Sequence, residues 1–149
     1  MRALALIDLV TGESQQAIAG LDRLLAANPG DRRSLVNKAI ALDLQGNHAA
    51  AQSIYREVLV SEPNDPATTN NLAVSLMLEG RTGQALELLA PLQGADNPQR
   101  LRVNLGILYA AAGQPERSRQ FLGDNVTENE LSALTRALVA NSRENPRVQ

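Results

Sequence analysis

A repeated spacing of 34 residues constrains the fold of this chain more than any other feature of its sequence. Glycine, small residues and proline each recur at this spacing, which changes by one residue in the C-terminal part of the chain. The positions are Gly12, Gly46, Gly80 and Gly113; Ala17, Ala51 and Ala85, followed by Ser118; and Pro29, Pro63 and Pro98. Self-similarity at a period of about 20 to 50 residues is typical of solenoids and other repeat architectures. The spacing therefore predicts a stack of similar structural units.

Each unit has the pattern of two helices joined by a glycine turn. After Pro29, apolar residues recur at helical spacing through residues 32–45, and a second helix is predicted over residues 48–60. Gly46 lies between the two segments, where a residue that readily adopts a positive φ can end the first helix. The pattern predicts a helical hairpin in every unit.

Local signals mark where individual helices begin and end. Asp65 before Pro66 is a predicted N-cap with proline in the first turn. Thr127 and Glu130 have the spacing of a capping box, which predicts a last helix up to about residue 142. Pro91 removes a backbone donor within a predicted helix, so that helix should bend or end there. A short helix is predicted over residues 115–122.

These boundaries describe one domain over residues 1–149. It comprises a partial repeat at 1–31, three repeats at 32–65, 66–98 and 99–126, and a capping helix at about 127–142. The composition agrees with an all-α fold. The chain has no Trp, one Phe and two Tyr, so alanine and aliphatic residues must build the core. Alanine and leucine favour helices, whereas strands favour β-branched and aromatic residues.

Residues that carry catalysis or hold a cofactor are scarce. The chain has no cysteine and one histidine, His48, which stands at a predicted helix start and suits a capping or solvent-exposed role. The glycines occur singly and not as a phosphate-binding loop. A net charge of −2 offers no basic field for nucleic acid, and no apolar run approaches the ~18 residues of a membrane span. We therefore expect a non-enzymatic protein without metal, cofactor or nucleic-acid partner.

Two small positions and one bulky position recur in each unit. Counted from the start of the first helix, they are positions 8, 20 and 24. The residues are Ala5, Ala39, Ala73 and Gly106; Ala17, Ala51, Ala85 and Ser118; and Leu21, Tyr55, Leu89 and Leu122. In the fourth unit, Asn104-Leu105-Gly106 followed by Tyr109 matches the pattern N-L-G-x-x-Y. Over residues 1–122 the chain resembles the tetratricopeptide repeat (TPR) family, which implies a right-handed superhelix of antiparallel helix pairs that binds other proteins.

The resemblance also implies a peptide-binding groove, formed by the first helices at positions 2, 5, 6, 9, 12 and 13. The predicted groove residues are Arg33, Val36, Asn37, Ile40, Leu44, Asn70, Asn71, Val74, Met77, Leu78, Arg100, Val103, Asn104 and Ile107. Asparagine recurs at position 6, where an amide can both donate to and accept from a peptide backbone. The same asparagines could instead brace neighbouring hairpins. The aliphatic residues around them suit an apolar helical or extended segment.

A longer stretch resembles a more specific family. It comprises Asn71–Leu76, Gly80-Arg81, Ala85–Leu92 and Pro98–Leu105. These segments resemble the repeat lipoprotein of tight-adherence (Tad/Flp) pilus assembly, the TadD family. The resemblance implies a pilotin-like factor on the periplasmic side of the outer membrane that assists the pilus secretin. It also implies a signal peptide and a lipid-bearing cysteine upstream of Met1, whereas Met1–Ile7 themselves are interpreted as part of a mature helix because Asp8 interrupts the apolar run.

Two other functions fit the same repeats. A cytoplasmic scaffold or secretion chaperone would bind an apolar peptide through the same groove. An auxiliary TPR domain of a larger protein would do so beside a catalytic domain. A reading frame that begins at Met1 without an upstream lipidation signal would favour the first alternative, and catalytic motifs in further coding sequence would favour the second.

Overall fold

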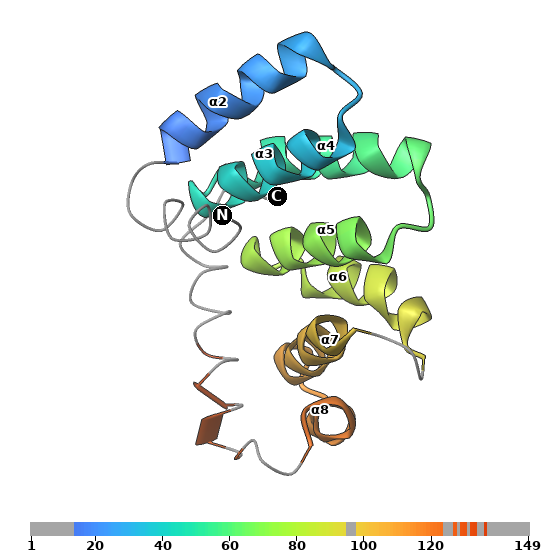
Figure 1. Ribbon diagram of the computed structural model, residues 1–149. Helices are drawn as coiled ribbons and strands as arrows, with labels where there is room; N and C mark the ends of the chain where they lie inside the picture. The colour runs from blue at the N-terminus through green and yellow to red at the C-terminus, as the bar shows by residue number, and fades with distance from the viewer. Residues whose placement is uncertain are drawn as a thin grey trace. The chain divides into compact units, whose positions relative to one another are not determined.

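The computed structural model describes residues 14–94 and 98–123, and residues 127, 129, 130, 132, 133 and 136 beyond them. In these residues the regular secondary structure is helical and includes no strand, which confirms the all-α prediction (Figure 1). The helices are α2 (Ser14–Ala27), α3 (Arg32–Leu44), α4 (His48–Ser61), α5 (Pro66–Leu78), α6 (Thr82–Leu89), the 3-10 helix η1 (Ala90–Leu92), α7 (Gln99–Ala111) and α8 (Pro115–Leu122). The observed ends of α3 and α4 lie within one residue of the predicted ones. The chain divides into two compact units, Met1–Leu72 and Ala73–Gln149, and the boundary falls within α5.

In the N-terminal unit, α3 packs against both α2 and α4 (Figure 1). Small side chains allow this packing, because Ala39 and Ala41 of α3 and Ala51 of α4 have no exposed surface. Larger side chains of α4 complete the core, and Tyr55 is the largest of them at 1% exposure. Ala39, Ala51 and Tyr55 are the residues that the repeat pattern places at positions 8, 20 and 24.

In the C-terminal unit, α7 packs against α6 and α8. Gly106 marks the close approach of α7 and α8, because a Cβ added there would overlap Cγ of Leu122. A glycine is therefore the residue that fits while Leu122 keeps its position. Tyr109 of α7 and Phe121 of α8 stack with ring centroids 5.5 Å apart, and the guanidinium carbon of Arg117 lies 5.4 Å from the Tyr109 centroid.

Three of the glycines that define the period end first helices in the same way. Gly46, Gly80 and Gly113 follow α3, α5 and α7 with φ angles of 75°, 77° and 72°. In each turn the N–H of the next residue donates to the carbonyl five residues earlier. The pairs are Asn47 to Leu42 at 2.8 Å, Arg81 to Leu76 at 2.9 Å and Gln114 to Tyr109 at 2.8 Å. These are Schellman motifs, in which the left-handed residue is usually glycine because a Cβ is unfavourable there.

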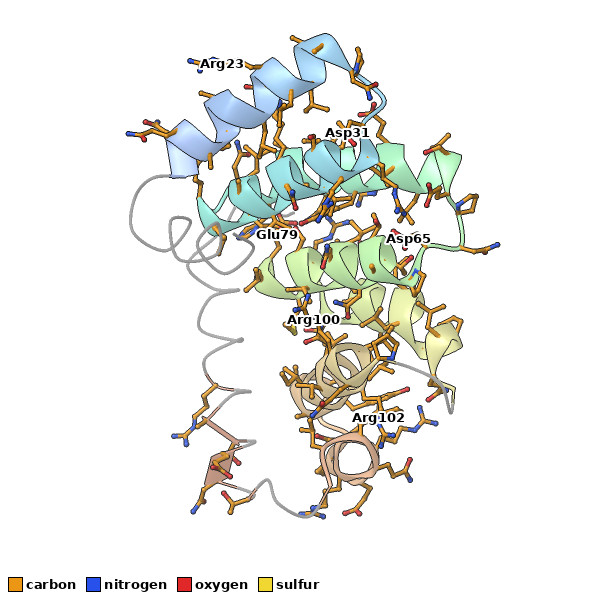
Figure 2. All side chains as sticks on the ribbon, viewed as in Figure 1. Arg23, Asp31, Asp65, Glu79, Arg100 and Arg102 are labelled. Carbon is orange, nitrogen blue, oxygen red and sulfur yellow. The ribbon has the colours of Figure 1, made fainter. Side chains whose placement is uncertain are left out.

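The starts of α3 and α5 are marked by aspartates, which Figure 2 shows at the preceding turns. Asp65 accepts hydrogen bonds from the amide of Thr68 at 3.1 Å and from its hydroxyl, which confirms the predicted N-cap. Burial alone would raise the pKa of the Asp65 carboxyl, but the bonds from Thr68 and the nearby charge of Arg32 hold this pKa below its usual range. Asp31 accepts a bond from the hydroxyl of Ser34, which lowers the pKa of its carboxyl.

The sequence pattern places Pro91 inside a helix, and the observed α-helix ends just before this proline. The α-helical part, α6, stops at Leu89, and the chain continues as the 3-10 helix η1 through Leu92. This confirms the prediction that the helix bends or ends at the proline, whose ring and missing N–H are incompatible with a helix interior.

Two predicted segments lie largely outside the described residues: the opening of the first repeat, residues 1–13, and the capping helix at about 127–142. The capping box itself is described. The Thr127 amide donates to Glu130 Oε2 at 2.8 Å, and the Glu130 amide donates to Thr127 Oγ1 at 3.3 Å. Residues 129, 130, 132, 133 and 136 are helical. The box is therefore confirmed as a helix start.

Candidate protein-binding site

The predicted binding residues lie on α3, α5 and α7, the first helices of their repeats. On α3, Arg33 and Asn37 are exposed, Val36 and Ile40 are half-buried, and Leu44 keeps 50% of its surface exposed. Their offsets of three and four residues place them along one side of the helix. This helix thus presents a face that combines one cation, one amide and three aliphatic side chains.

Other residues of α3 are buried or paired within the N-terminal unit. Ser34, Ala39 and Ala41 are buried, and the helix packs against α2 and α4. Lys38 Nζ lies 2.6 Å from Asp22 Oδ1 of α2, and Arg32 pairs with Glu62 just after α4. Such exposed ion pairs contribute little stability, at most about 1 kcal/mol each, but they hold the side chains of α3 that flank the face.

On α5 the predicted set is reduced by burial. Asn71, Val74 and Leu78 are half-buried, whereas Asn70 and Met77 have exposures of 5% and 7%. Their burial is part of a wider pattern, because α5 is buried around most of its circumference. The other buried residues of this helix are residues 68, 72, 73, 75 and 76. Asn70 and Met77 therefore offer little area to a partner, and the accessible face of α5 consists of Asn71, Val74 and Leu78.

On α7 the predicted residues are accessible to different extents. Arg100 is exposed, Val103 keeps 38% of its surface exposed, and Asn104 and Ile107 are half-buried. Figure 2 shows Arg100 and Arg102 on opposite sides of this helix, as their separation of two residues requires. We call the accessible predicted residues of α3, α5 and α7 the first-helix faces.

The asparagines at position 6 differ in their surroundings. Asn37 is exposed, and its side chain forms no hydrogen bond in the described part of the chain. Asn71 is half-buried and likewise forms no side-chain hydrogen bond there, whereas Asn104 already takes part in an interaction within the chain. Of these three asparagines, Asn37 and Asn71 are thus the ones whose amides stay unbonded within the described residues and can bond a ligand.

A polar cluster at the turn between α3 and α4 is not evident from the repeat pattern. Asp43 Oδ1 lies 2.8 Å from His48 Nδ1, and the Tyr55 hydroxyl donates to Asp43 Oδ2 at 3.1 Å. Burial, and then the charge of Asp43, raises the pKa of the Tyr55 hydroxyl far above its usual value. His48 and Tyr55 are seven residues apart on α4, a spacing that could have indicated a shared face. The cluster ties α3 to α4, so Asp43 and His48 serve the fold.

Features of other kinds of function, a metal centre and a membrane span, are absent from the described residues. Among residues 14–94 and 98–123 and the few described beyond them, the acidic and histidine side chains form no group of three suited to a metal ion. No helix in that same part of the chain combines the length and apolar character that a membrane span requires.

Comparison with known proteins gives these helix pairs a family. Tetratricopeptide repeat family models match residues 2–67, 42–100 and 99–124. The crystal structure of a tetratricopeptide repeat protein from Parabacteroides merdae matches with a TM-score of 0.71 and 17% identity, over 91% of this chain and 55% of that chain. An uncharacterized protein of Sinorhizobium fredii, y4yS, is 39% identical over 69 residues, which are 46% of this chain and 38% of that protein. The matched regions thus span 38% of the Sinorhizobium protein and 55% of the Parabacteroides protein.

The residues matched by the family models include the helices that build the fold. Together they extend from residue 2 to residue 124, and this range contains every described helix from α2 to α8. Tetratricopeptide repeats serve in general as non-catalytic scaffolds for protein–protein interaction. The glycine turns, the buried small residues and these matches lead to one conclusion: the chain belongs to the tetratricopeptide repeat family.

Proposed function

We propose that the chain is a pilotin-like assembly factor of a bacterial Tad/Flp pilus, which binds an apolar segment of the pilus secretin or of another assembly component. The full-length protein would lie on the periplasmic side of the outer membrane, held by a lipid anchor upstream of Met1. The resemblance of Asn71–Leu105 to the TadD family supports the pilus assignment, and membership of a protein-binding repeat family supports the scaffold role.

The binding role is supported most strongly by the side chains on one side of α3. Asn37 is an exposed amide that forms no hydrogen bond with the described residues, and it is flanked by the half-buried Val36 and Ile40. An amide in this setting can donate to a peptide carbonyl and accept from a peptide N–H. The aliphatic neighbours would exclude water from those bonds, which makes them stronger.

The exposed hydrophobic side chains support an apolar partner. Four large hydrophobic residues are exposed in the described part of the chain: Leu24, Leu44, Val60 and Val103. Leu44 and Val103 belong to the first-helix faces. Because burying such a side chain fully is worth about 1.5–3 kcal/mol, an apolar partner that covers either of them gains binding free energy that a polar partner would not.

We expect Asn37→Ala combined with Asn71→Ala to weaken binding of a partner peptide by roughly tenfold to a hundredfold. Each substitution removes an amide that we assign to the peptide backbone, at about 0.5–1.5 kcal/mol per hydrogen bond. The free energy of unfolding should stay the same or rise slightly, because alanine is the better helix former. The measurement is isothermal titration calorimetry with synthetic peptides that tile the C-terminal region of the pilus secretin.

A matched control is Asn47→Ala, which removes an exposed amide that precedes α4 and lies off the first-helix faces. This variant should bind as the wild type does. Equal affinity of the double variant and the wild type would refute the role of the asparagines. Failure of every secretin peptide to bind the wild type would contradict the secretin as partner.

A further inference from the structure

The same four residue types occupy the same four positions of α3 and α7. Both helices carry the pattern Arg-x-x-Val-Asn-x-x-Ile, which gives an α3 quartet and an α7 quartet. The α3 quartet is Arg33, Val36, Asn37 and Ile40, and the α7 quartet is Arg100, Val103, Asn104 and Ile107. Offsets of three, four and seven residues place each quartet on one side of its helix. Each compact unit therefore carries one copy of an identical surface pattern.

The arginine of each quartet is available to a partner. Arg33 and Arg100 are exposed, and within the described residues neither guanidinium forms a hydrogen bond or an ion pair. Two other cations of α3 differ from Arg33 in this respect, because Arg32 pairs with Glu62 and Lys38 with Asp22.

The charge of Arg33 acts on the nearby carboxyl of Asp31 and helps to lower its pKa. That pKa is lowered first by the hydroxyl of Ser34, then by backbone bonds from Ser34 and Arg33, and last by the charge of Arg33. The Asp31 carboxylate is thus engaged mainly at the start of α3, and it forms no ion pair with Arg33. The arginine retains its planar set of donors for a second carboxylate.

We propose that each quartet binds a peptide segment in which an acidic side chain is followed by apolar ones. The arginine would pair with the carboxylate, for which guanidinium offers two parallel donors. Valine and isoleucine would pack against the apolar side chains, and in the α3 quartet the amide of Asn37 would bind the peptide backbone. This inference rests on the proposed protein-binding function and specifies the chemistry of the partner: an acidic and apolar segment, present twice or bound in two copies.

The dimensions of a quartet set the spacing of that segment. Seven residues of α-helix separate the arginine from the isoleucine, which at 1.5 Å per residue is about 10 Å. An extended peptide covers the same length with about three to four residues, since it rises about 3.3 Å per residue. Its side chains alternate between two faces, so the acidic and apolar residues should occupy every second position.

The test is an NMR titration of the isotope-labelled protein with two peptides that differ in one residue. The first is Ser-Glu-Ser-Leu-Ser-Leu-Ser with blocked ends, and the second has Gln in place of Glu. We expect amide shifts on both α3 and α7, with dissociation constants roughly fivefold lower for the Glu peptide, the size of an exposed ion pair. Arg33→Gln should abolish the preference for Glu at α3 alone, and Arg100→Gln at α7 alone.

Arg23→Gln is the matched control, because Arg23 is an exposed arginine of α2 outside both quartets (Figure 2). It should leave both dissociation constants unchanged. Equal affinities for the Glu and Gln peptides would overturn the acidic specificity and leave the apolar binding function standing. A further peptide has Gln in place of Glu and a free C-terminus. If it bound as tightly as the blocked Glu peptide, the arginine would recognise a C-terminal carboxylate, and the proposed acidic side chain would be wrong. If neither peptide caused shifts, both the peptide binding by the quartets and the binding role of α3 and α7 would be contradicted.

Discussion

Tyr55→Ala is expected to lower the free energy of unfolding by about 3–5 kcal/mol, as for other large aromatic side chains removed from a core. Tyr55 is 1% exposed at the bulky position of its repeat, so its loss leaves a cavity in the N-terminal unit. The hydroxyl also donates to Asp43 at 3.1 Å, and this bond is lost as well. Urea unfolding followed by circular dichroism measures the change.

Two controls separate the parts of this effect. Tyr55→Phe keeps the ring and removes the hydroxyl, so it should cost about 1 kcal/mol, the worth of one hydrogen bond. Val60→Ala truncates a residue of the same helix that is 83% exposed and should change the free energy by less than about 0.5 kcal/mol. If Tyr55→Ala unfolded at the same urea concentration as Val60→Ala, the packing described for α4 would be wrong.

Ala85→Leu is expected to destabilise the C-terminal unit by about 1–3 kcal/mol, the usual cost of overpacking a core. Ala85 lies on α6 with no exposed surface, at the second small position of the repeat. Leucine and alanine have similar helix propensities, so the loss would come from packing and not from the helix itself. The melting temperature, measured by circular dichroism, should fall.

The corresponding control is Ala26→Leu, at an exposed position of α2. It makes the same chemical change without a neighbour to displace, so its melting temperature should match that of the wild type. If Ala85→Leu melted at the wild-type temperature, the assignment of Ala85 to a small position of the repeat would be wrong. The alignment of the repeat units with one another would then be wrong as well.

The sequence allowed the helical hairpins and their boundaries to be predicted because backbone constraints are local. The glycines at positions 46, 80 and 113 have a positive φ that other residues avoid. Pro91 ends α6 close to where its chemistry requires. Asp65 and Thr127 cap helices through residues three positions away. Each of these features depends on a few neighbouring residues, which a reader of the sequence can see.

Other features depend on contacts between helices and could not be predicted in the same way. Position 5 projects to the binding side in the repeat pattern, yet Asn70 there is buried while Val103 at the equivalent position of α7 is 38% exposed. The bond between Asp43 and Tyr55 joins residues of two helices, and the fit of Leu122 over Gly106 also joins two. Burial and pairing of this kind are properties of the packed structure and not of a single helix pattern.

The measurement that tests the binding account most directly is photo-cross-linking in cells that assemble the pilus. The four large hydrophobic residues exposed in the described part of the chain provide matched positions: Leu44 and Val103 lie on the first-helix faces, whereas Leu24 and Val60 lie on α2 and α4. Each is replaced in turn, as in Leu44→p-benzoylphenylalanine. Cross-links to the pilus secretin or another assembly component at positions 44 and 103, and none at 24 and 60, are the predicted result. Cross-links confined to positions 24 and 60 would contradict binding through the first helices.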